Sequence, residues 1–187
     1  GLSWGQRNVH GKGYARYLPN VKTNRQAFFI QEKLSFNPIY FDAGYRTEKV
    51  EHQIQDQTFV LARNANNQKL ENRDFDLTQF YVVAGVNWGE HVHVYTKYSE
   101  SERAPEINEL YSSNPHYSVM TQEEGNQNLE KEKVKAMELN TDFAFDQSTI
   151  QLSLYQMDFT NYVYLIFLTP RVSPPLPFLS RYAMVRF

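Results

Sequence analysis

The chain has 187 residues, a formal net charge of −2, 41% hydrophobic residues, 13 Tyr, 13 Phe and no Cys. This apolar and aromatic content excludes a disordered chain, and the absence of Cys excludes a disulfide framework. A net charge near zero gives no general reason to bind nucleic acid, whose phosphates require clustered Lys and Arg. No run of about 18 apolar residues occurs, which excludes a helical membrane span. The mean hydropathy of −0.61 is compatible with a soluble protein and with a transmembrane barrel, in which half of each strand faces a polar lumen.

Alternation of apolar and polar residues predicts strands along most of the chain. In residues 39–51, Phe41 and Tyr45 fall on one face while Asp42 and Arg46 fall on the other. Short turns are expected to join three strand pairs: residues 24–35 with 39–51, residues 79–86 with 92–98, and residues 137–145 with 150–154. The predicted fold class is therefore all-β with antiparallel pairing.

The connections alternate between these short turns and long polar segments, at residues 9–23, 52–75 and 102–131. Short periplasmic turns and long extracellular loops are typical of an outer-membrane barrel. Several predicted strands also reach the roughly ten residues needed to cross a bilayer at a tilt. The alternative is a soluble all-β module, either a sandwich or a barrel of long hairpins, that binds a small ligand or a carbohydrate.

The barrel interpretation assigns one face of the strands to lipid and the other to a wet interior. A charge on the lipid side would cost about 2–4 kcal/mol at mid-bilayer. The residues predicted to face lipid, or the exposed convex side of a curved sheet, are Phe41, Tyr45, Val82, Val86 and Phe143. The residues predicted to line the interior are Asp42, Arg46 and Glu48. Packing of the first set inside a closed two-layer core would instead indicate a sandwich.

Four segments in the second half of the chain follow one order and spacing: Arg103 to Tyr111, Glu123 to Glu132, Glu138-Leu139, and Tyr155 to Val163. In this pattern Pro105 ends a strand by withholding an N–H, and Gly125-Asn126 predicts a turn with positive φ. The pattern resembles that of the TonB-dependent outer-membrane receptors. The resemblance implies an antiparallel transmembrane β-barrel, here about seven or eight strands of a barrel that has about 22 in complete members.

Within that family the chain is most similar to the branch that takes up zinc and related metals. This resemblance depends on Leu18-Pro19 and on His116, which follows Tyr111 by five residues. Two departures stand against it. Glu124 lies where an apolar residue is usual, and the residues at 112–114 are Ser, Ser and Asn where one loop His is common.

The resemblance implies two regions, a partial receptor barrel at residues 1–167 and an aberrant Pro-rich tail at residues 168–187. The four prolines from Pro170 to Pro177 are expected to prevent a strand there, because each removes a ladder donor. Complete members also carry an N-terminal plug domain, and no segment of this sequence resembles one. We therefore expect a truncated or frame-shifted reading frame.

The implied function is that of an outer-membrane receptor fragment in a Gram-negative cell, for uptake of a metal or metal complex such as zinc, an iron–siderophore complex or haem. The expected partners are outer-membrane lipid, the ligand at the extracellular loops, and the TonB system in the intact receptor. No nucleic acid and no resident cofactor is expected.

Catalysis has no support in the sequence, which lacks Cys, a Gly-x-Ser-x-Gly motif and a phosphate-binding glycine loop. The candidate metal ligands are His116, Glu123 and Glu124 in the longest loop, since imidazole and carboxylate groups suit zinc. A solvated loop histidine is the alternative. His91 and His93 lie two apart on a predicted strand and could also chelate a metal, but near the opposite end of the strands.

Overall fold

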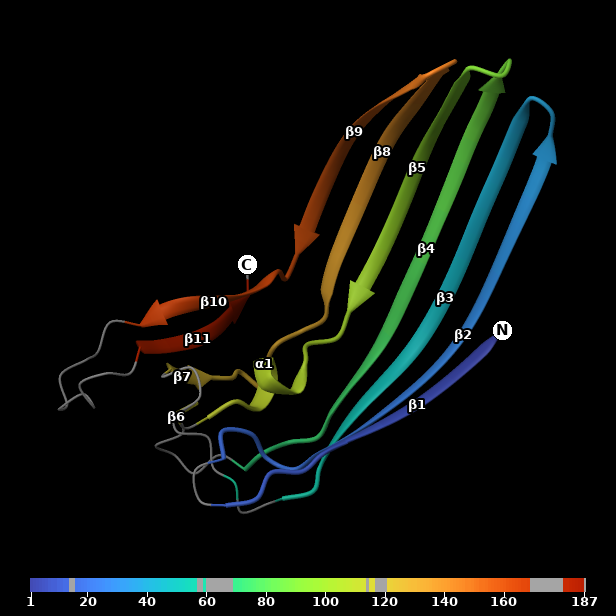
Figure 1. The fold of residues 1–187 in the computed structure, drawn as a ribbon. Coiled ribbons are helices and arrows are strands. Elements are labelled where there is room, and N and C mark those ends of the chain that lie inside the picture. Colours follow the sequence, from blue (N-terminus) through green and yellow to red (C-terminus); the bar gives the residue numbers. More distant parts are fainter. Residues whose placement is uncertain are drawn as a thin grey trace.

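A computed structural model describes residues 1–13, 16–56, 59, 69–113, 115–116, 121–168 and 180–186. Seven strands form one antiparallel sheet in the order β1-β2-β3-β4-β5-β8-β9, which curves like part of a cylinder wall (Figure 1). These strands are β1 (Leu2–Val9), β2 (Val21–Phe36), β3 (Ile39–Ile54), β4 (Arg73–Trp88), β5 (Val92–Arg103), β8 (Glu132–Phe145) and β9 (Ser148–Thr160). The predicted all-β fold with about seven barrel strands is confirmed.

The short and long connections segregate to opposite ends of the sheet. The tight turns β2–β3, β4–β5 and β8–β9 lie at the upper end in Figure 1, and the long connections lie at the lower end. Strands β2, β3 and β4 each have 16 residues, more than the roughly 9–11 that cross a bilayer. These strands are therefore longer than a membrane-crossing part requires, and they extend toward the long connections. We call the end of the sheet that carries the long connections the loop end.

A second, smaller sheet lies at the loop end, in the order β10-β11-β7-β6. Its strands are β6 (Pro115–His116), β7 (Thr121–Glu124), β10 (Val163–Leu168) and β11 (Ser180–Arg186). Strand β11 pairs in parallel with β7 and antiparallel with β10. Residues 170–177, predicted to form no strand, lie outside the described residues, so the division at residue 167 stays a prediction.

The described residues contain one helix, α1 (Ile107–Tyr111), which follows β5. None of the helical structure described is long and apolar enough to cross a membrane.

The register assigns each strand residue to one of two faces. We call the face that bears α1 the inner face and the opposite face the outer face. Phe41, Tyr45 and Val82 lie on the outer face and are 47%, 44% and 48% exposed. Val86 and Phe143 share this face and are partly exposed, and none of the five belongs to the described core. This arrangement agrees with the prediction for a barrel wall and contradicts a sandwich.

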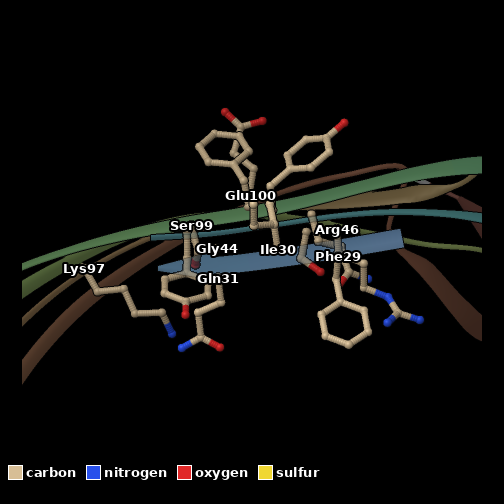
Figure 2. A pocket seen from close by; sticks show the side chains of 13 residues that line it. Phe29, Ile30, Gln31, Gly44, Arg46, Lys97, Ser99 and Glu100 are labelled. Atoms are coloured by element: carbon tan, nitrogen blue, oxygen red, sulfur yellow. The ribbon is translucent and has the colours of Figure 1, made fainter. Parts of the chain in front are cut away.

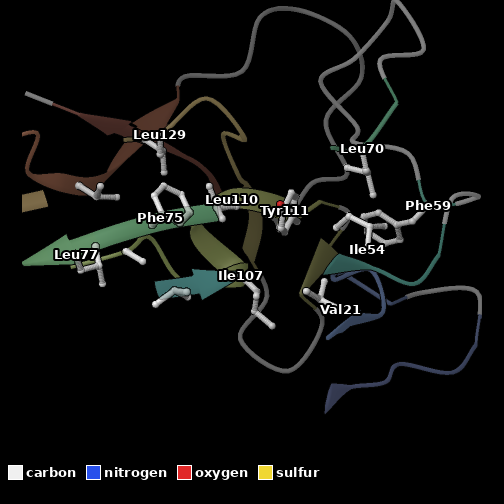
Figure 3. Close-up of a cluster of buried hydrophobic side chains, with 13 residues drawn as sticks. Val21, Ile54, Phe59, Leu70, Phe75, Leu77, Ile107, Leu110, Tyr111 and Leu129 are labelled. Carbon is white, nitrogen blue, oxygen red and sulfur yellow. The ribbon is translucent and has the colours of Figure 1, made fainter. Parts of the chain in front are cut away.

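The main core lies at the loop end, on the inner face. Phe75 and Leu77 of β4 lie beside Leu110 and Leu129 of the β5–β8 connection (Figure 3), and Val50 of β3 belongs to the same buried cluster. These side chains are at most 6% exposed. Burial of each large apolar side chain contributes about 1.5–3 kcal/mol to folding stability. The base of this connection is therefore packed firmly onto the inner face of the sheet.

Candidate ligand-capture site

The base of the β5–β8 connection is a short helix that its own sequence caps. Pro105 follows the end of β5, and Glu106 and Glu109 form a capping box in which the Glu106 N–H donates to the Glu109 carboxylate at 2.7 Å. Leu110 and Tyr111, on the buried side of α1, are both 0% exposed. The Tyr111 hydroxyl donates to the carbonyl of Glu71 at 2.8 Å. Helix α1 is therefore fixed at both ends despite having only five residues.

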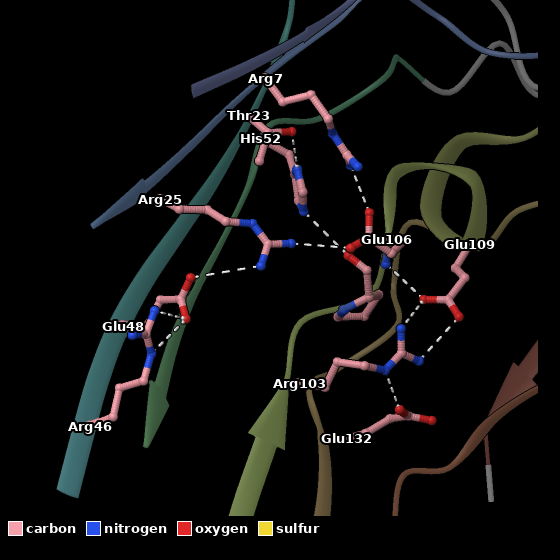
Figure 4. A network of polar contacts seen from close by, with 11 residues as sticks. Arg7, Thr23, Arg25, Arg46, Glu48, His52, Arg103, Glu106, Glu109 and Glu132 are labelled. Atoms are coloured by element: carbon pink, nitrogen blue, oxygen red, sulfur yellow. Dashed lines mark hydrogen bonds and ion pairs between the residues drawn. The ribbon is translucent and has the colours of Figure 1, made fainter. Parts of the chain in front are cut away.

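Three strands hold the residues just before this helix. The Glu106 carboxylate accepts from Arg7 of β1 at 2.6 Å and from Arg25 of β2 at 3.1 Å (Figure 4). His52 of β3 is fully buried, and its Nε2 lies 3.2 Å from the carbonyl oxygen of Pro105. We call this arrangement the Glu106 anchor. Its strand residues all project from the inner face. The anchor therefore holds the start of the β5–β8 connection against the inner face at the loop end of the sheet.

At the anchor, the interactions of Glu106 with the arginines change its pKa more than burial does. Burial alone would raise the pKa of Glu106, but the hydrogen bond from Arg7 and the positive charges of Arg7 and Arg25 lower it. The anchor carboxylate is therefore ionised throughout the neutral range.

A third arginine joins the two ends of the same connection. Arg103, the last residue of β5, pairs with Glu109 of α1 at 2.9 Å and also with Glu132, the first residue of β8 (Figure 4). Both carboxylates are largely shielded, at 15% and 13% side-chain exposure. The departing and returning strands are thereby held together at the base of the loop.

The Gly125-Asn126 turn packs directly beneath the helix. A Cβ built on Gly125 would lie 2.7 Å from backbone atoms of Leu110, Tyr111 and Ser112. The prediction of positive φ at this turn is wrong, because neither Gly125 nor Asn126 has it. Glycine is needed there for close approach of two backbone segments.

The hairpin β6–β7, next to this base, carries the residues predicted to bind metal. His116 pairs through its backbone with Thr121, and its side chain lies outside the described residues. Glu124 is 8% exposed and Glu123 is partly buried. Consecutive strand residues point to opposite faces, so the two carboxylates diverge.

Burial and the nearby charge of Glu123 raise the pKa of Tyr17, which places β7 close to the β1–β2 connection. Within the described part of the chain, no group of three or more His, Asp and Glu side chains could hold a metal. The site at His116, Glu123 and Glu124 stays a prediction.

The second histidine candidate is committed to other partners. His93 Nε2 lies 3.0 Å from the Tyr40 hydroxyl and His93 Nδ1 lies 3.3 Å from the Asp142 carboxylate. His91 lies in the exposed turn before β5. With both ring nitrogens in contact with protein groups, His93 has no lone pair to offer a metal in this arrangement.

Midway along the wall, the inner face contributes to a shallow hollow of about 420 Å³. Figure 2 shows Gln31, Arg46 and Lys97 on one side of the sheet and Glu100 on the other. Arg46 pairs with Glu48 at 3.0 Å, and Lys97 lies 3.6 Å from Glu138. The lumen side of the wall is thus polar, with its charges balanced by neighbours.

Sequence analysis did not identify the residues of the anchor. The alternation of apolar and polar residues could have indicated the inward positions of Arg7, Arg25 and His52 on their strands. Their partner Glu106 lies 81 residues beyond Arg25, and no local pattern specifies a contact of that range.

A family model described as TonB dependent receptor-like, beta-barrel matches residues 1–182. The chain belongs to this family. TonB-dependent receptors are outer-membrane transporters, so the predicted localisation and the prediction that the chain is not an enzyme are confirmed.

Two solved structures have the same fold as this TonB-dependent receptor chain. One is a double mutant of the Serratia marcescens hemophore receptor HasR in complex with its hemophore HasA and heme, with a TM-score of 0.75 and 16% identity over 99% of this chain. The other is the copper transporter OprC, with a TM-score of 0.70 and 14% identity over 89% of this chain. The matches cover 33% and 24% of those chains, so this chain spans about a third or less of either structure.

Proposed function

We propose that this chain is part of the wall of a receptor that takes up a metal or a metal complex, and that its β5–β8 connection helps to capture the ligand. The observation that carries the proposal is the anchored base of that connection. Helix α1, Arg103 and the Glu106 anchor hold residues 103–113 rigidly, and this base presents the hairpin β6–β7. A rigid base lowers the entropic cost of ordering a binding loop.

Metal-bearing cargo agrees with the two structural neighbours. HasR was solved with heme and OprC is a copper transporter. In this chain we propose that His116 provides the metal-binding imidazole, together with Glu123 or Glu124. The divergence of these two carboxylates favours one of them, not both, as the partner of His116.

We also propose that the outer face contacts lipid and that the intact receptor draws energy from the TonB system. Uptake of radiolabelled zinc by cells that express the intact receptor tests the dependence on the TonB system. Loss of uptake in cells that lack TonB is the expected result, and unchanged uptake would contradict it.

The role of His116 is tested by zinc titration of the intact receptor in detergent. We expect His116→Ala to weaken zinc binding at least tenfold, because a neutral imidazole supplies one of few ligands. Affinity should also fall as the pH drops through about 6.5, where the imidazole becomes protonated.

The matched control is the double variant His91→Ala, His93→Ala, which should bind zinc like the wild type because His93 is committed to Tyr40 and Asp142. Loss of affinity in the double variant with none in His116→Ala would overturn the assignment. No loss in either would leave an iron or haem complex as the better ligand class, to be tested by haem titration.

A further inference from the structure

Two arginines from neighbouring strands hold one carboxylate of the β5–β8 connection. Glu106 accepts from Arg7 of β1 through Oε2 at 2.6 Å and from Arg25 of β2 through Oε1 at 3.1 Å (Figure 4). Arg7 pairs with Thr23, two residues before Arg25, so both arginines lie on the inner face. We call these two guanidinium groups the arginine clamp. Each oxygen of the carboxylate binds one arginine, and a carboxylate of any other molecule could bind there in the same way.

The clamp is accessible to solvent. The side chains of Arg7, Arg25 and Glu106 are 51%, 42% and 36% exposed. Ion pairs with this exposure are weak, because water and dissolved ions compete for both partners. An anion at the loop end can therefore reach the guanidinium groups and compete with Glu106.

The wall around the clamp has more positive than negative charge. Arg25 also lies 3.7 Å from Glu48, and Glu48 pairs with Arg46 at 3.0 Å. With the other clamp arginine, three guanidinium groups thus share the two carboxylates of Glu48 and Glu106. The remaining two carboxylates labelled in Figure 4 both pair with Arg103. Departure of Glu106 would leave one carboxylate among three arginines, and this charge attracts anions.

Loss of the Glu106 contacts would release only one side of the loop base. Arg103 would still pair with Glu109, now at 2.9 Å, and Tyr111 would still donate to the carbonyl of Glu71, now at 2.8 Å. Helix α1 would therefore stay attached on the side of β4 and β5, while its start could move away from β1 and β2.

We propose that the arginine clamp is a binding site for a carboxylate of the incoming ligand, and that Glu106 occupies the clamp until the ligand arrives. This inference rests on the proposed function and names its ligand class, a metal complex whose chelator carries carboxylates. A carboxylate between Arg7 and Arg25 displaces Glu106 and frees the start of α1, so that a ligand captured at the loop reaches the inner face. Because Glu106 is tethered beside the clamp, its effective concentration is of millimolar order, and a free carboxylate competes only in that range.

The test uses the intact receptor in detergent at neutral pH, with tricarballylate, a tricarboxylate without bound metal, as the probe. Ligand-observed NMR measures the affinity for tricarballylate, and hydrogen exchange of residues 104–113 measures release of the loop base. For the wild type we expect a Kd in the millimolar range and exchange that accelerates several-fold at saturation. Sodium chloride at equal ionic strength corrects for screening of the ion pairs.

Glu106→Gln is the decisive variant, because it removes the charge of the internal competitor and leaves both arginines in place. We expect it to bind tricarballylate about tenfold more tightly than the wild type, whereas Arg7→Gln and Arg25→Gln should each weaken binding about fivefold. The matched control is Lys97→Gln, which removes another inner-face cation, one that lies 3.6 Å from Glu138. It should bind tricarballylate like the wild type. Migration on a semi-native gel verifies that each variant is folded.

Unchanged or weaker binding by Glu106→Gln would overturn the proposal, and so would binding that leaves the exchange of residues 104–113 unchanged. Equal affinity for inorganic phosphate, with the same dependence on Arg7 and Arg25, would contradict selection of carboxylates. The probe carries no metal, so its failure to bind would leave the zinc titration of His116 unaffected. Failure of zinc binding would equally leave the tricarballylate result unaffected.

Discussion

Two glycines on the inner face lie beneath tyrosine rings of the neighbouring strand. Gly44 of β3 pairs with Tyr81 of β4, and Gly85 of β4 pairs with Tyr40 of β3. A Cβ at Gly44 would lie 2.4 Å from the Tyr81 ring, and one at Gly85 would lie 2.3 Å from the Tyr40 ring. Because the rings lie flat on the wall, Tyr81 can donate to Asp42 at 2.9 Å and Tyr40 can reach His93. Covering a strand glycine with an aromatic ring pins the register of the pair.

We expect Gly44→Ala to destabilise the barrel by about 1–3 kcal/mol, because the tyrosine ring must leave its position. The measurement is the urea midpoint of the intact receptor refolded into lipid vesicles. Gly5→Ala is the control, since no atom lies within 4 Å of its Cβ position. Equal stability of the two variants would show that the Tyr81 ring moves aside without a loss of folding free energy.

The Glu106 anchor predicts a pH-dependent loop. Because the pKa of Glu106 is lowered in the folded state, its stabilising contribution is complete above the ordinary glutamate pKa of about 4.3 and is lost as the pH falls through the lowered value. Hydrogen exchange of residues 104–113 should therefore stay slow from neutral pH to about pH 5 and accelerate in stronger acid, after correction for intrinsic exchange rates. Constant protection down to pH 2 would exclude the anchor as the cause.

Removing the anchor charge should have a similar effect at neutral pH. We expect Glu106→Gln to cost about 0.2–1 kcal/mol for each of its two part-exposed ion pairs, which speeds local exchange several-fold. Glu90→Gln, at an exposed short turn, is the control. Identical exchange in the two variants would contradict the role of Glu106.

At the scale of elements, the long β5–β8 connection behaves as part of the core. Its base contributes Ile107, Leu110, Tyr111 and Leu129 to the buried cluster. Arg73 of β4 donates to the carbonyls of Gln127 and Leu129, which joins the returning half of the connection to the wall. A loop base with such packing changes shape as a unit.

Adjacent residues of β4 provide a matched test of the two faces. Val82 points outward and is 48% exposed, whereas Val83 points inward between Asp42 and Lys97. We expect Val82→Arg to destabilise the receptor in vesicles by about 2–4 kcal/mol, and Val83→Arg to have a much smaller effect because the lumen is polar and Asp42 is adjacent. Urea titrations measure both, and a larger loss for Val83→Arg would reverse the assignment of the faces.

At the scale of the whole molecule, the seven-stranded sheet remains open. Strands β1 and β9 stand at its two edges and do not pair with each other. Unpaired N–H and C=O groups at a strand edge cannot be left in lipid, so a membrane wall of this kind requires further strands.

The isolated 187-residue polypeptide should therefore associate in detergent through its edge strands β1 and β9. The intact receptor, in which those edges are paired, should instead form one barrel from one polypeptide. Sedimentation in detergent measures this difference. A monodisperse monomer of the isolated polypeptide would show that its edges are satisfied internally.

The sequence by itself determined the six long strands β2, β3, β4, β5, β8 and β9, their faces and their pairing into hairpins, but it did not indicate β1 or α1. A period of two is a local property, and the turns at 36–38, 87–90 and 146–148 connect neighbours that need no distant information. The family was also readable from segments whose spacing is local. The β5–β8 connection was recognised by its residues, but the wrong reason was given for Gly125, because close approach of two backbones is not visible in either segment alone.

Only the tertiary structure decided what the long connections do. The contacts of Glu106 with Arg7 and Arg25, and of Arg73 with Gln127, each join residues more than 50 positions apart. Such contacts exist only after the sheet has curved and placed the inner face of β1–β4 beneath α1. The same curvature places the polar inner face beneath the loop base and leaves the apolar outer face exposed, so one register produces both faces.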